Sequence, residues 1–258
     1  MSTLGEVLDL LSDPVPAVNS LPPTHLTDAR EFNGIAKLGH LPIKHCRIQK
    51  EDLLYLFYGG VFYRRSYRPT ANAGRLPIAF LLSPIVLNSM HCYYPFDTGG
   101  VATGRYGTSG DRLRTFEDLY RVWGKNYTIP AKMVYYLYGS NDAYLWGSPN
   151  VDLKTRPEPC PTLFDFLSAE LTRIGIDQRW RRIEARSKSA ISTRDLLWVG
   201  FPSGFESEFG QLYESLKPFV PEYYRYPAHP ARRPGEMAAL LETKAHEIIQ
   251  RFMHLPIR

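Results

Sequence analysis

The apolar residues of the chain recur with two different periods, which predicts a mixture of short strands and helices. Residues 77–82 are continuously apolar between breaking residues, as is typical of a buried strand. A second such run, residues 196–201, ends at Pro202. Residues 206–216 and 236–253 instead repeat their apolar side chains at helical spacing. The pattern predicts an α+β fold in which helices flank several short strands.

A short strand followed by a helix is predicted near the start of the chain. Residues 24–27 read Thr-His-Leu-Thr, and Asp28 is suited to cap a helix that runs to Leu38. Gly39 then provides a plausible C-terminal stop. Residues 1–23 contain a brief amphipathic stretch and several prolines, so we predict that they form a lead-in to the folded core.

Two further segments carry side chains suited to a binding site. Residues 52–63 (DLLYLFYGGVFY) are apolar and aromatic almost throughout, and a Gly-Gly pair interrupts them. Residues 91–110 are rich in glycine and threonine, which predicts a long loop beside a site. We expect Asp97 and Arg105 to be exposed on that loop.

A glutamate in a basic setting is the candidate for chemistry. Residues 181–186 (RRIEAR) predict an extended edge segment, with Glu184 near its end. The ordinary interpretation is a solvated edge with weak surface ion pairs. Alternatively, the cations attract a polyanion such as nucleic acid, which suits a net charge of +5 and a pI near 9.0. The cations predicted to contact nucleic acid are Arg105, Arg181, Arg182, Arg186 and Lys188.

Other features of the sequence exclude some classes of protein. No apolar stretch reaches the ~20 residues that a membrane-spanning helix needs, and the N-terminal residues do not resemble a signal peptide. The three cysteines are widely spaced, and the histidines show no zinc-binding spacing. We therefore expect a cytoplasmic protein without a metal site or membrane association.

Three segments together resemble the ADP-ribosyltransferase superfamily, and most of all its DarT-type members, which modify nucleic acids. THLTDAREFNGIAKLGHLPI is similar to the opening His-x-Thr strand and helix of that family. DLLYLFYGGVFYRR is similar to its aromatic second motif, and RIEARSKSAISTRDLLWVG to its segment with a glutamate before a late strand. The resemblance covers roughly residues 20–202.

The resemblance implies a split mixed β-sheet core with flanking helices. This catalytic core would span residues 24–205, and a C-terminal helical extension would span residues 206–258. Glu184 would be the catalytic residue. The implied NAD-binding residues are His25, Leu26, Thr27, Tyr58, Tyr63 and Arg64, although Arg47 or Arg65 could contact the diphosphate in place of Arg64.

The implied function is transfer of one ADP-ribose unit from NAD, the co-substrate, to an RNA or DNA acceptor. The setting implied by the family is a bacterial toxin or anti-phage effector, with an antitoxin protein as a partner. Two alternatives stay open. One is a basic nucleic-acid-binding module on the same fold without NAD chemistry, and the other is an NAD glycohydrolase that uses water as the acceptor. His25 and the aromatic side chains are, alternatively, ordinary packing residues.

Overall fold

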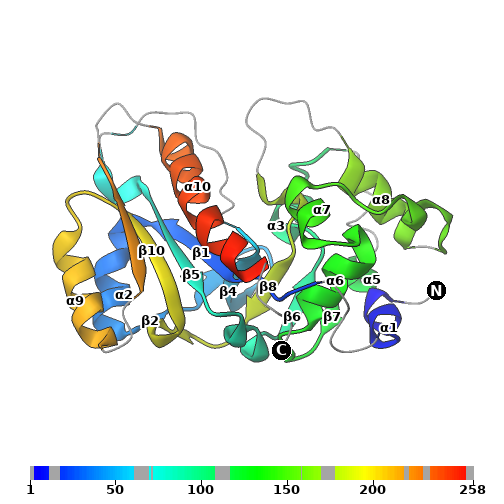
Figure 1. Cartoon of the computed structure of the whole chain (residues 1–258), viewed down its shortest axis with the longest axis horizontal. Helices are drawn as coiled ribbons and strands as arrows, with labels where there is room; N and C mark the ends of the chain where they lie inside the picture. The colour runs from blue at the N-terminus through cyan, green and yellow to red at the C-terminus, as the bar shows by residue number, and fades with distance from the viewer. Residues whose placement is uncertain are drawn as a thin grey trace.

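The computed structural model describes residues 3–11, 18–60, 70, 72–107, 117–157, 159–169, 178–217, 221–228 and 233–253. Strands in these ranges form a nine-stranded sheet that runs through the middle of the molecule (Figure 1). Its order is β11-β10-β5-β1-β4-β8-β6-β7, and β3 pairs with β4 beside this row. All neighbours are antiparallel except β10 and β11, which are parallel. The predicted α+β class is confirmed.

The strands are short and most are buried. Their bounds are β1 Pro23–Asp28, β3 Lys44–Cys46, β4 Glu51–Tyr58, β5 Pro77–Leu82, β6 Cys92–Tyr94, β7 Val122–Trp123, β8 Glu184–Ser187, β10 Leu196–Pro202 and β11 Glu222–Tyr226. A separate pair joins β2 (His40–Leu41) to β9 (Ile191–Ser192). The predicted strands at residues 24–27, 77–82 and 196–201 correspond to β1, β5 and β10.

Helices cover both ends of the sheet (Figure 1). Their bounds are α1 Leu4–Asp9, α2 Phe32–Leu38, α3 Thr98–Ala102, α5 Glu117–Tyr120, α6 Ile129–Tyr138, α7 Asn141–Trp146, α8 Cys160–Ser168, α9 Glu206–Leu216 and α10 Pro234–Met253. The predicted end of α2 at Gly39 is confirmed, because Gly39 has a left-handed φ of 68° that favours glycine. No helix of the described chain is long and apolar enough to cross a membrane.

Helices pack on opposite faces of the sheet at β10. The ring of Phe201 contacts Phe32 of α2 and Phe209 of α9. The preceding residue, Gly200, faces the other way, since successive strand residues point to opposite faces. A Cβ at Gly200 would lie 2.3 Å from a methyl of Leu241, so glycine allows α10 to lie directly on the sheet. Figure 1 shows α10 crossing in front of the strands while α2 and α9 lie together at one end.

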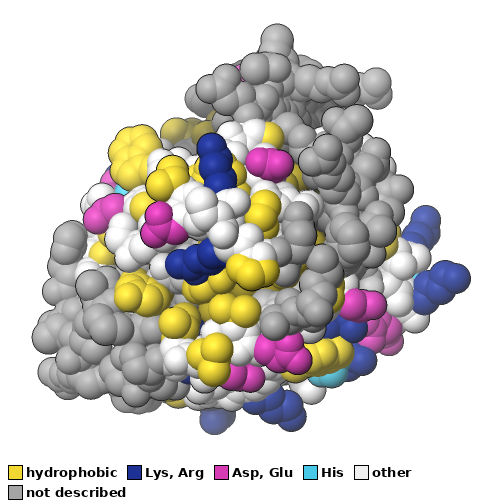
Figure 2. Space-filling model, turned by 90° about the vertical axis from the view of Figure 1, so that its right-hand side faces the viewer, with side chains coloured by type: hydrophobic (Ala, Val, Ile, Leu, Met, Phe, Trp, Pro, Cys, Tyr) yellow, Lys and Arg dark blue, Asp and Glu magenta, His cyan; other side chains and the backbone are white. Residues whose placement is uncertain are grey.

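The other end of the molecule is built from α1 and α5–α8. Apolar side chains lie among charged ones on this face, which Figure 2 shows from the right-hand side of Figure 1. Leu10 and Val151 are among the most exposed large apolar residues of the described chain. A buried apolar core nevertheless extends through both ends and the sheet between them.

Three predicted segments differ from the structure. Residues 91–110 contain a strand, β6, and a short helix, α3, where a loop was expected. The expected edge segment at residues 181–186 is wrong, because β8 lies between β4 and β6 and is buried throughout. The segment after residue 206 includes β11, which adds a strand to the main sheet. It therefore contributes to the sheet as well as supplying helices.

Candidate active site

A pocket opens in the sheet where β1 and β4 separate. The two strands pair only at Pro23–Tyr58 and Thr24–Phe57, after which β1 follows β5 and β4 follows β8. The pocket has a volume of about 400 Å³, within the range usual for ligand sites. Its walls are formed by His25, Leu26, Thr27, Lys44, Cys46, Ile48, Tyr55, Phe57, Asp97, Gly99, Arg105, Arg179 and Glu184.

Glu184 enters this pocket from the middle of the sheet. It pairs in register with Phe57 of β4 on one side and Tyr94 of β6 on the other, and is only 1% exposed. Thr98, the first residue of α3, binds both carboxylate oxygens of Glu184. Its backbone N–H donates to Oε2 at 3.2 Å and its hydroxyl donates to Oε1 at 2.7 Å. These two bonds fix the orientation of the carboxylate.

Arg186 is the buried counter-ion of Glu184. Its Nε donates to Glu184 Oε1 at 2.8 Å, a second nitrogen donates to the Thr98 hydroxyl, and its guanidinium lies 4.2 Å from the centre of the Tyr94 ring. Burial raises the pKa of Glu184, the Arg186 charge opposes this rise, and nearby Asp97 adds to it. The pair is therefore buried from solvent, and each charged group is stabilised mainly by the opposite charge of the other.

Asp97 organises the wall next to Glu184. It caps α3 by accepting the N–H of Gly100 at 3.2 Å through Oδ1, while Oδ2 accepts the hydroxyl of Tyr106 at 2.7 Å. Arg105 and Arg179 approach the same Oδ2, at 3.4 and 3.5 Å. The prediction that Asp97 is exposed is wrong, because its exposed fraction is 2%. Its two arginine partners bring positive charge into the pocket.

His25 is held in a defined tautomer at the pocket wall. Its Nδ1 lies 3.0 Å from the carbonyl oxygen of Tyr55, and since a carbonyl can only accept, Nδ1 carries the proton. Nε2 is then an acceptor. Burial lowers the pKa of His25 to about 4, with Lys44 adding to the effect and the Tyr55 carbonyl opposing it. The ring is therefore neutral near pH 7.

The pocket brings together four of the residues expected to bind or cleave NAD, namely His25, Leu26, Thr27 and Glu184. Glu184 and the strand of His25 lie far apart along the chain, so the fold creates this proximity. Tyr63 and Arg64, together with Arg65, lie outside the described residues.

No protein-family model and no curated protein sequence matches the chain. Solved structures of one protein do match. The chain is similar to DarT.

The similar structures are of DarT from Thermus sp. 2.9. Its complex with NAD+ is 8% identical, with a TM-score of 0.40 over 84% of this chain and 97% of that chain. The complex with carba-NAD+ is 9% identical, with a TM-score of 0.39 over 80% and 96%. The complex with ADP-ribosylated ssDNA is 9% identical, with a TM-score of 0.40 over 80% and 94%. Identities this low leave the chemistry of the pocket to be judged from its own residues.

Tyr58 does not line the pocket as predicted. It is fully buried on the opposite face of β4, where its hydroxyl accepts the N–H of Leu21 at 2.7 Å. Because side chains alternate along a strand, Tyr55 and Phe57 face the pocket instead. Phe57 also lies under the guanidinium of Arg179, 5.5 Å from its ring centre. The aromatic wall is therefore shifted by one residue from the expected position.

Three of the arginines expected at a nucleic-acid surface have other partners. Arg186 is 2% exposed and paired with Glu184, so the prediction of a surface role is wrong. Arg181 donates to the carbonyls of Gly147 and Ala169, and Arg182 to those of Tyr144 and Leu145. These bonds attach the start of β8 to the helical end of the molecule.

The remaining predicted cations differ in position. Arg105 lines the pocket beside Asp97, which suits contact with a ligand inside it. Lys188 is exposed and forms an ion pair of 2.7 Å with Glu51. Within the described ranges, no group of histidine, cysteine and acidic residues could hold a metal ion.

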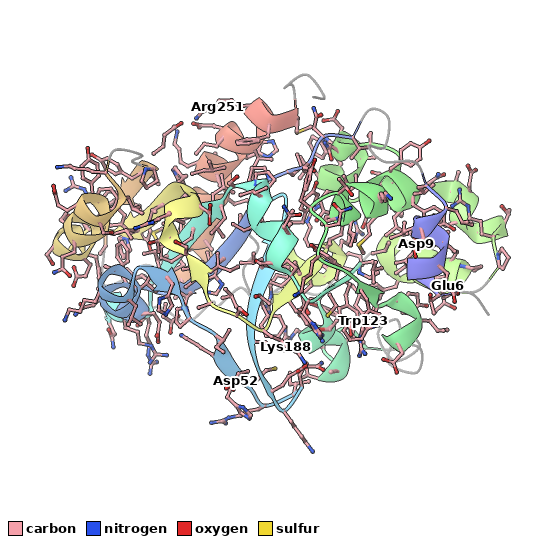
Figure 3. All side chains as sticks on the ribbon, turned by 90° about the horizontal axis from the view of Figure 1, so that it is seen from below. Glu6, Asp9, Asp52, Trp123, Lys188 and Arg251 are labelled. Carbon is pink, nitrogen blue, oxygen red and sulfur yellow. The ribbon has the colours of Figure 1, made fainter. Side chains whose placement is uncertain are left out.

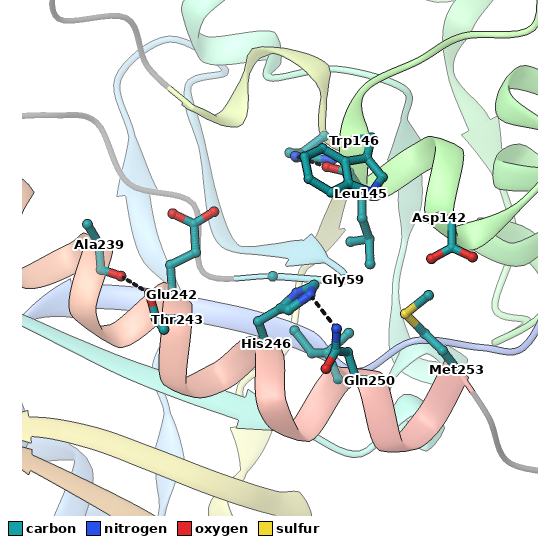
Figure 4. Close-up of a pocket in the computed structure, with 13 residues that line it drawn as sticks. Gly59, Asp142, Leu145, Trp146, Ala239, Glu242, Thr243, His246, Gln250 and Met253 are labelled. Carbon is teal, nitrogen blue, oxygen red and sulfur yellow. Dashed lines mark hydrogen bonds between the residues drawn. The ribbon is translucent and has the colours of Figure 1, made fainter.

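A second pocket, of about 470 Å³, lies between α7 and α10 (Figure 4). Trp146 borders it from α7, and His246 and Gln250 of α10 are hydrogen-bonded to each other at 3.1 Å on the other side. Neither His25 nor Glu184 is among its lining residues. We therefore place the candidate active site in the first pocket, which holds the buried carboxylate.

Proposed function

We propose that the chain is a mono-ADP-ribosyltransferase, which cleaves NAD between nicotinamide and ribose and transfers ADP-ribose to a nucleic-acid acceptor. One observation carries the proposal. The side chains of His25, Thr27 and Glu184 meet in one pocket that also contains aromatic rings and arginines. This combination provides a carboxylate for the sugar, flat walls for the nicotinamide ring and cations for the diphosphate.

The carboxylate of Glu184 is suited to the bond that breaks. When the nicotinamide–ribose bond cleaves, the electron pair leaves with nicotinamide and the ribose becomes cation-like at C1. A fixed negative group beside the sugar stabilises this charge, by roughly 3–4 kcal/mol for a single preorganised group. The acceptor then bonds to C1 and gives up a proton, for which the carboxylate of Glu184 is the nearby base.

The other walls of the pocket are suited to hold NAD. The rings of Tyr55 and Phe57 offer flat faces for the positively charged nicotinamide. Nε2 of His25 accepts a hydrogen bond from the amide or from a ribose hydroxyl. Arg105 and Arg179 supply the cationic forks that diphosphates prefer. The proposal therefore assigns the diphosphate to these two arginines rather than to Arg47, Arg64 or Arg65.

The proposal is tested by following both halves of the donor. The protein is incubated with NAD labelled in its adenylate phosphate, with single-stranded DNA, RNA, protein or no acceptor, and released nicotinamide is measured. We expect label in a nucleic-acid pool and nicotinamide release, both reduced about 10²- to 10³-fold in Glu184→Gln. Glu214→Gln, at an exposed site on α9, is the matched control and should resemble wild type.

The remaining outcomes separate the alternatives. Glu184-dependent nicotinamide release without label in any pool indicates an NAD glycohydrolase. Salt-sensitive nucleic-acid binding without nicotinamide release indicates a binding module that lacks NAD chemistry. Label that Glu184→Gln incorporates as well as wild type contradicts the proposed role of the carboxylate.

A further inference from the structure

Cationic and aromatic residues alternate in the sequence at the edge strand β7 and directly after it. Every second residue from 121 to 127 is one or the other, namely Arg121, Trp123, Lys125 and Tyr127. Val122, between the first two, is buried. β7 is the last strand of the sheet at this end, with Arg121 and Trp123 at it, while Lys125 and Tyr127 follow in the segment that leads to α6. Trp123 and Tyr127 are 57% and 42% exposed.

Trp123 is surrounded by groups that fix its position and add positive charge. The guanidinium of Arg121 lies 4.9 Å from the centre of its ring system, and the ring of His91 lies at 4.8 Å in an edge-on arrangement. Burial is the largest cause of the lowered pKa of His91, and the nearby positive charges of Lys188 and Lys125 add to it. Figure 3 shows Trp123 and Lys188 near each other on the same side of the molecule.

This edge lies on the same face of the sheet as Glu184. Trp123 pairs with Cys92, which pairs with Arg186, and directly paired residues project to the same face. At a strand spacing of ~4.8 Å, the backbone of Trp123 is about 10 Å from that of Arg186. Glu184 is two residues further along β8 and therefore shares the face of Arg186.

Side chains connect the edge to the carboxylate without a break. Arg121 stacks on Trp123, donates to the hydroxyl of Tyr94 and lies 5.6 Å from the Tyr94 ring centre. Arg186 stacks on the same Tyr94 ring and bonds Glu184. Tyr94 and Arg186 are 0% and 2% exposed, so this row is a buried link that fixes the position of Trp123 relative to Glu184 and is not itself a contact surface for the acceptor.

We propose that this edge, formed by His91, Arg121, Trp123, Lys125, Tyr127 and Lys188, binds the single-stranded nucleic-acid acceptor and directs it to Glu184. The inference rests on the proposed function and names the place where its acceptor binds. A base stacks on the indole of Trp123, a second aromatic contact is available at Tyr127, and the lysines meet the backbone phosphates. Sequence-tolerant binding of single strands uses this combination of aromatic rings and cations.

The charges on the edge favour a polyanion over a peptide. Arg121 and Lys188 are each paired with one exposed carboxylate, Asp118 at 2.9 Å and Glu51 at 2.7 Å. Such surface pairs are weak, so a phosphate competes with them readily. Lys125 has no ion-pair partner among the residues that the structure describes, and its charge is available for a phosphate. Phosphate contacts therefore add a salt-dependent part to the affinity that stacking provides.

The test compares two exposed tryptophans. Trp123→Ala is measured against Trp146→Ala, which removes the most exposed tryptophan of the described chain, on α7. Fluorescent single-stranded oligonucleotides of DNA and of RNA report affinity, and labelled NAD reports transfer. We expect Trp123→Ala to raise the Kd and the acceptor KM at least about fivefold, with nicotinamide release in the absence of acceptor unchanged. Trp146→Ala should match wild type in all three measurements.

A second variant does not depend on removing a tryptophan. Lys125→Ala should lower the slope of log affinity against log salt by about 0.7, the value for one phosphate contact on a single strand. Lys37→Ala, at an exposed site on α2, is its control and should leave the slope unchanged.

Failure of this inference differs from failure of the proposed function. If wild type transfers ADP-ribose to an oligonucleotide and both Trp123→Ala and Lys125→Ala do so with unchanged KM, the acceptor binds elsewhere and this inference is overturned. If wild type releases no nicotinamide, the proposed function fails, while loss of oligonucleotide binding in Trp123→Ala would still support the binding edge. If wild type binds the oligonucleotide and neither variant weakens that binding, the inferred binding edge is overturned, whether or not the protein cleaves NAD.

Discussion

Replacing Glu184 by glutamine should destabilise the protein as well as inactivate it. Glutamine has the same shape but no charge, so it removes the carboxylate that pairs with the buried guanidinium of Arg186. Glu184 and Arg186 are 1% and 2% exposed, so solvent cannot compensate for the loss. Breaking a buried pair by removing one partner costs about 3–5 kcal/mol. We expect this loss in the free energy of unfolding of Glu184→Gln.

A second substitution separates stability from chemistry. In Glu184→Gln/Arg186→Met the buried charge is gone, and replacement of a whole buried pair by well-packed apolar groups is often neutral or stabilising. We therefore expect the double variant to unfold within about 1 kcal/mol of wild type. Nicotinamide release should stay about 10²- to 10³-fold below wild type, because the carboxylate is still missing.

The assays are urea unfolding, followed by tryptophan fluorescence, and nicotinamide release by the same samples. Glu51→Gln is the matched control, since it breaks the exposed pair with Lys188 and should cost less than about 1 kcal/mol. Equal unfolding midpoints for wild type and Glu184→Gln would refute the buried pair. Recovery of activity in the double variant would show that instability, and not the missing carboxylate, explains the loss.

Three further predictions follow from local geometry. The unfolded chain protonates His25 near its ordinary pKa of 6.5, whereas the folded protein does so at about 4, so stability should fall as pH decreases through this interval. The fall measured by urea unfolding should be up to about 3 kcal/mol larger than in His25→Gln, and equal pH profiles would contradict the assigned burial. Lys50 has a left-handed φ of 55°, so Lys50→Gly should raise the free energy of unfolding by about 0.5–1 kcal/mol, and a decrease in the urea midpoint would contradict this. A Cβ on Gly100 would lie 2.3 Å from the Tyr106 ring, so Gly100→Ala should displace the wall beside Glu184 and slow nicotinamide release about 10²-fold. Gly210→Ala, which meets nothing within 4 Å, should leave the rate unchanged, and equal rates for both variants would disprove the proposed clash.

The first strand and helix and the most apolar strands were predictable because their signals are local. Residues 77–82 are apolar at every position, which predicts a buried strand. Gly39 ends α2 because glycine readily adopts the left-handed conformation found there. His25 was placed correctly on a strand for the same reason. Its proximity to Glu184 came from the family resemblance, since no local pattern joins segments so far apart.

The aromatic wall was predicted on the correct strand but at the wrong residue. A strand of period two places Leu54, Leu56 and Tyr58 on one face and Tyr55 and Phe57 on the other. The first set belongs to the apolar core. Strict use of this alternation would have directed attention to Tyr55 and Phe57, which face the pocket.

Thr98 and Asp97, which hold the wall around Glu184, were missed because they come from a segment interpreted as a loop. Asp97 before Thr98 is a favourable N-cap, and this signal could have predicted α3. The basic residues around Glu184 suggested a solvated edge, yet β8 has strands on both sides. Burial of such a charged strand depends on tertiary neighbours, which the local sequence does not contain.

The parallel pairing of β11 with β10 determines how far the polypeptide can be shortened. A truncated protein that ends after residue 205 would lack β11, the outer neighbour of β10. The backbone N–H and C=O groups of β10 that pair with β11 would then have no hydrogen-bond partners. Bare strand borders of this kind recruit other chains and promote aggregation. The same truncation would also delete α10, which packs against the sheet at Gly200. Truncation or proteolysis at this point should therefore yield insoluble protein rather than a smaller active unit.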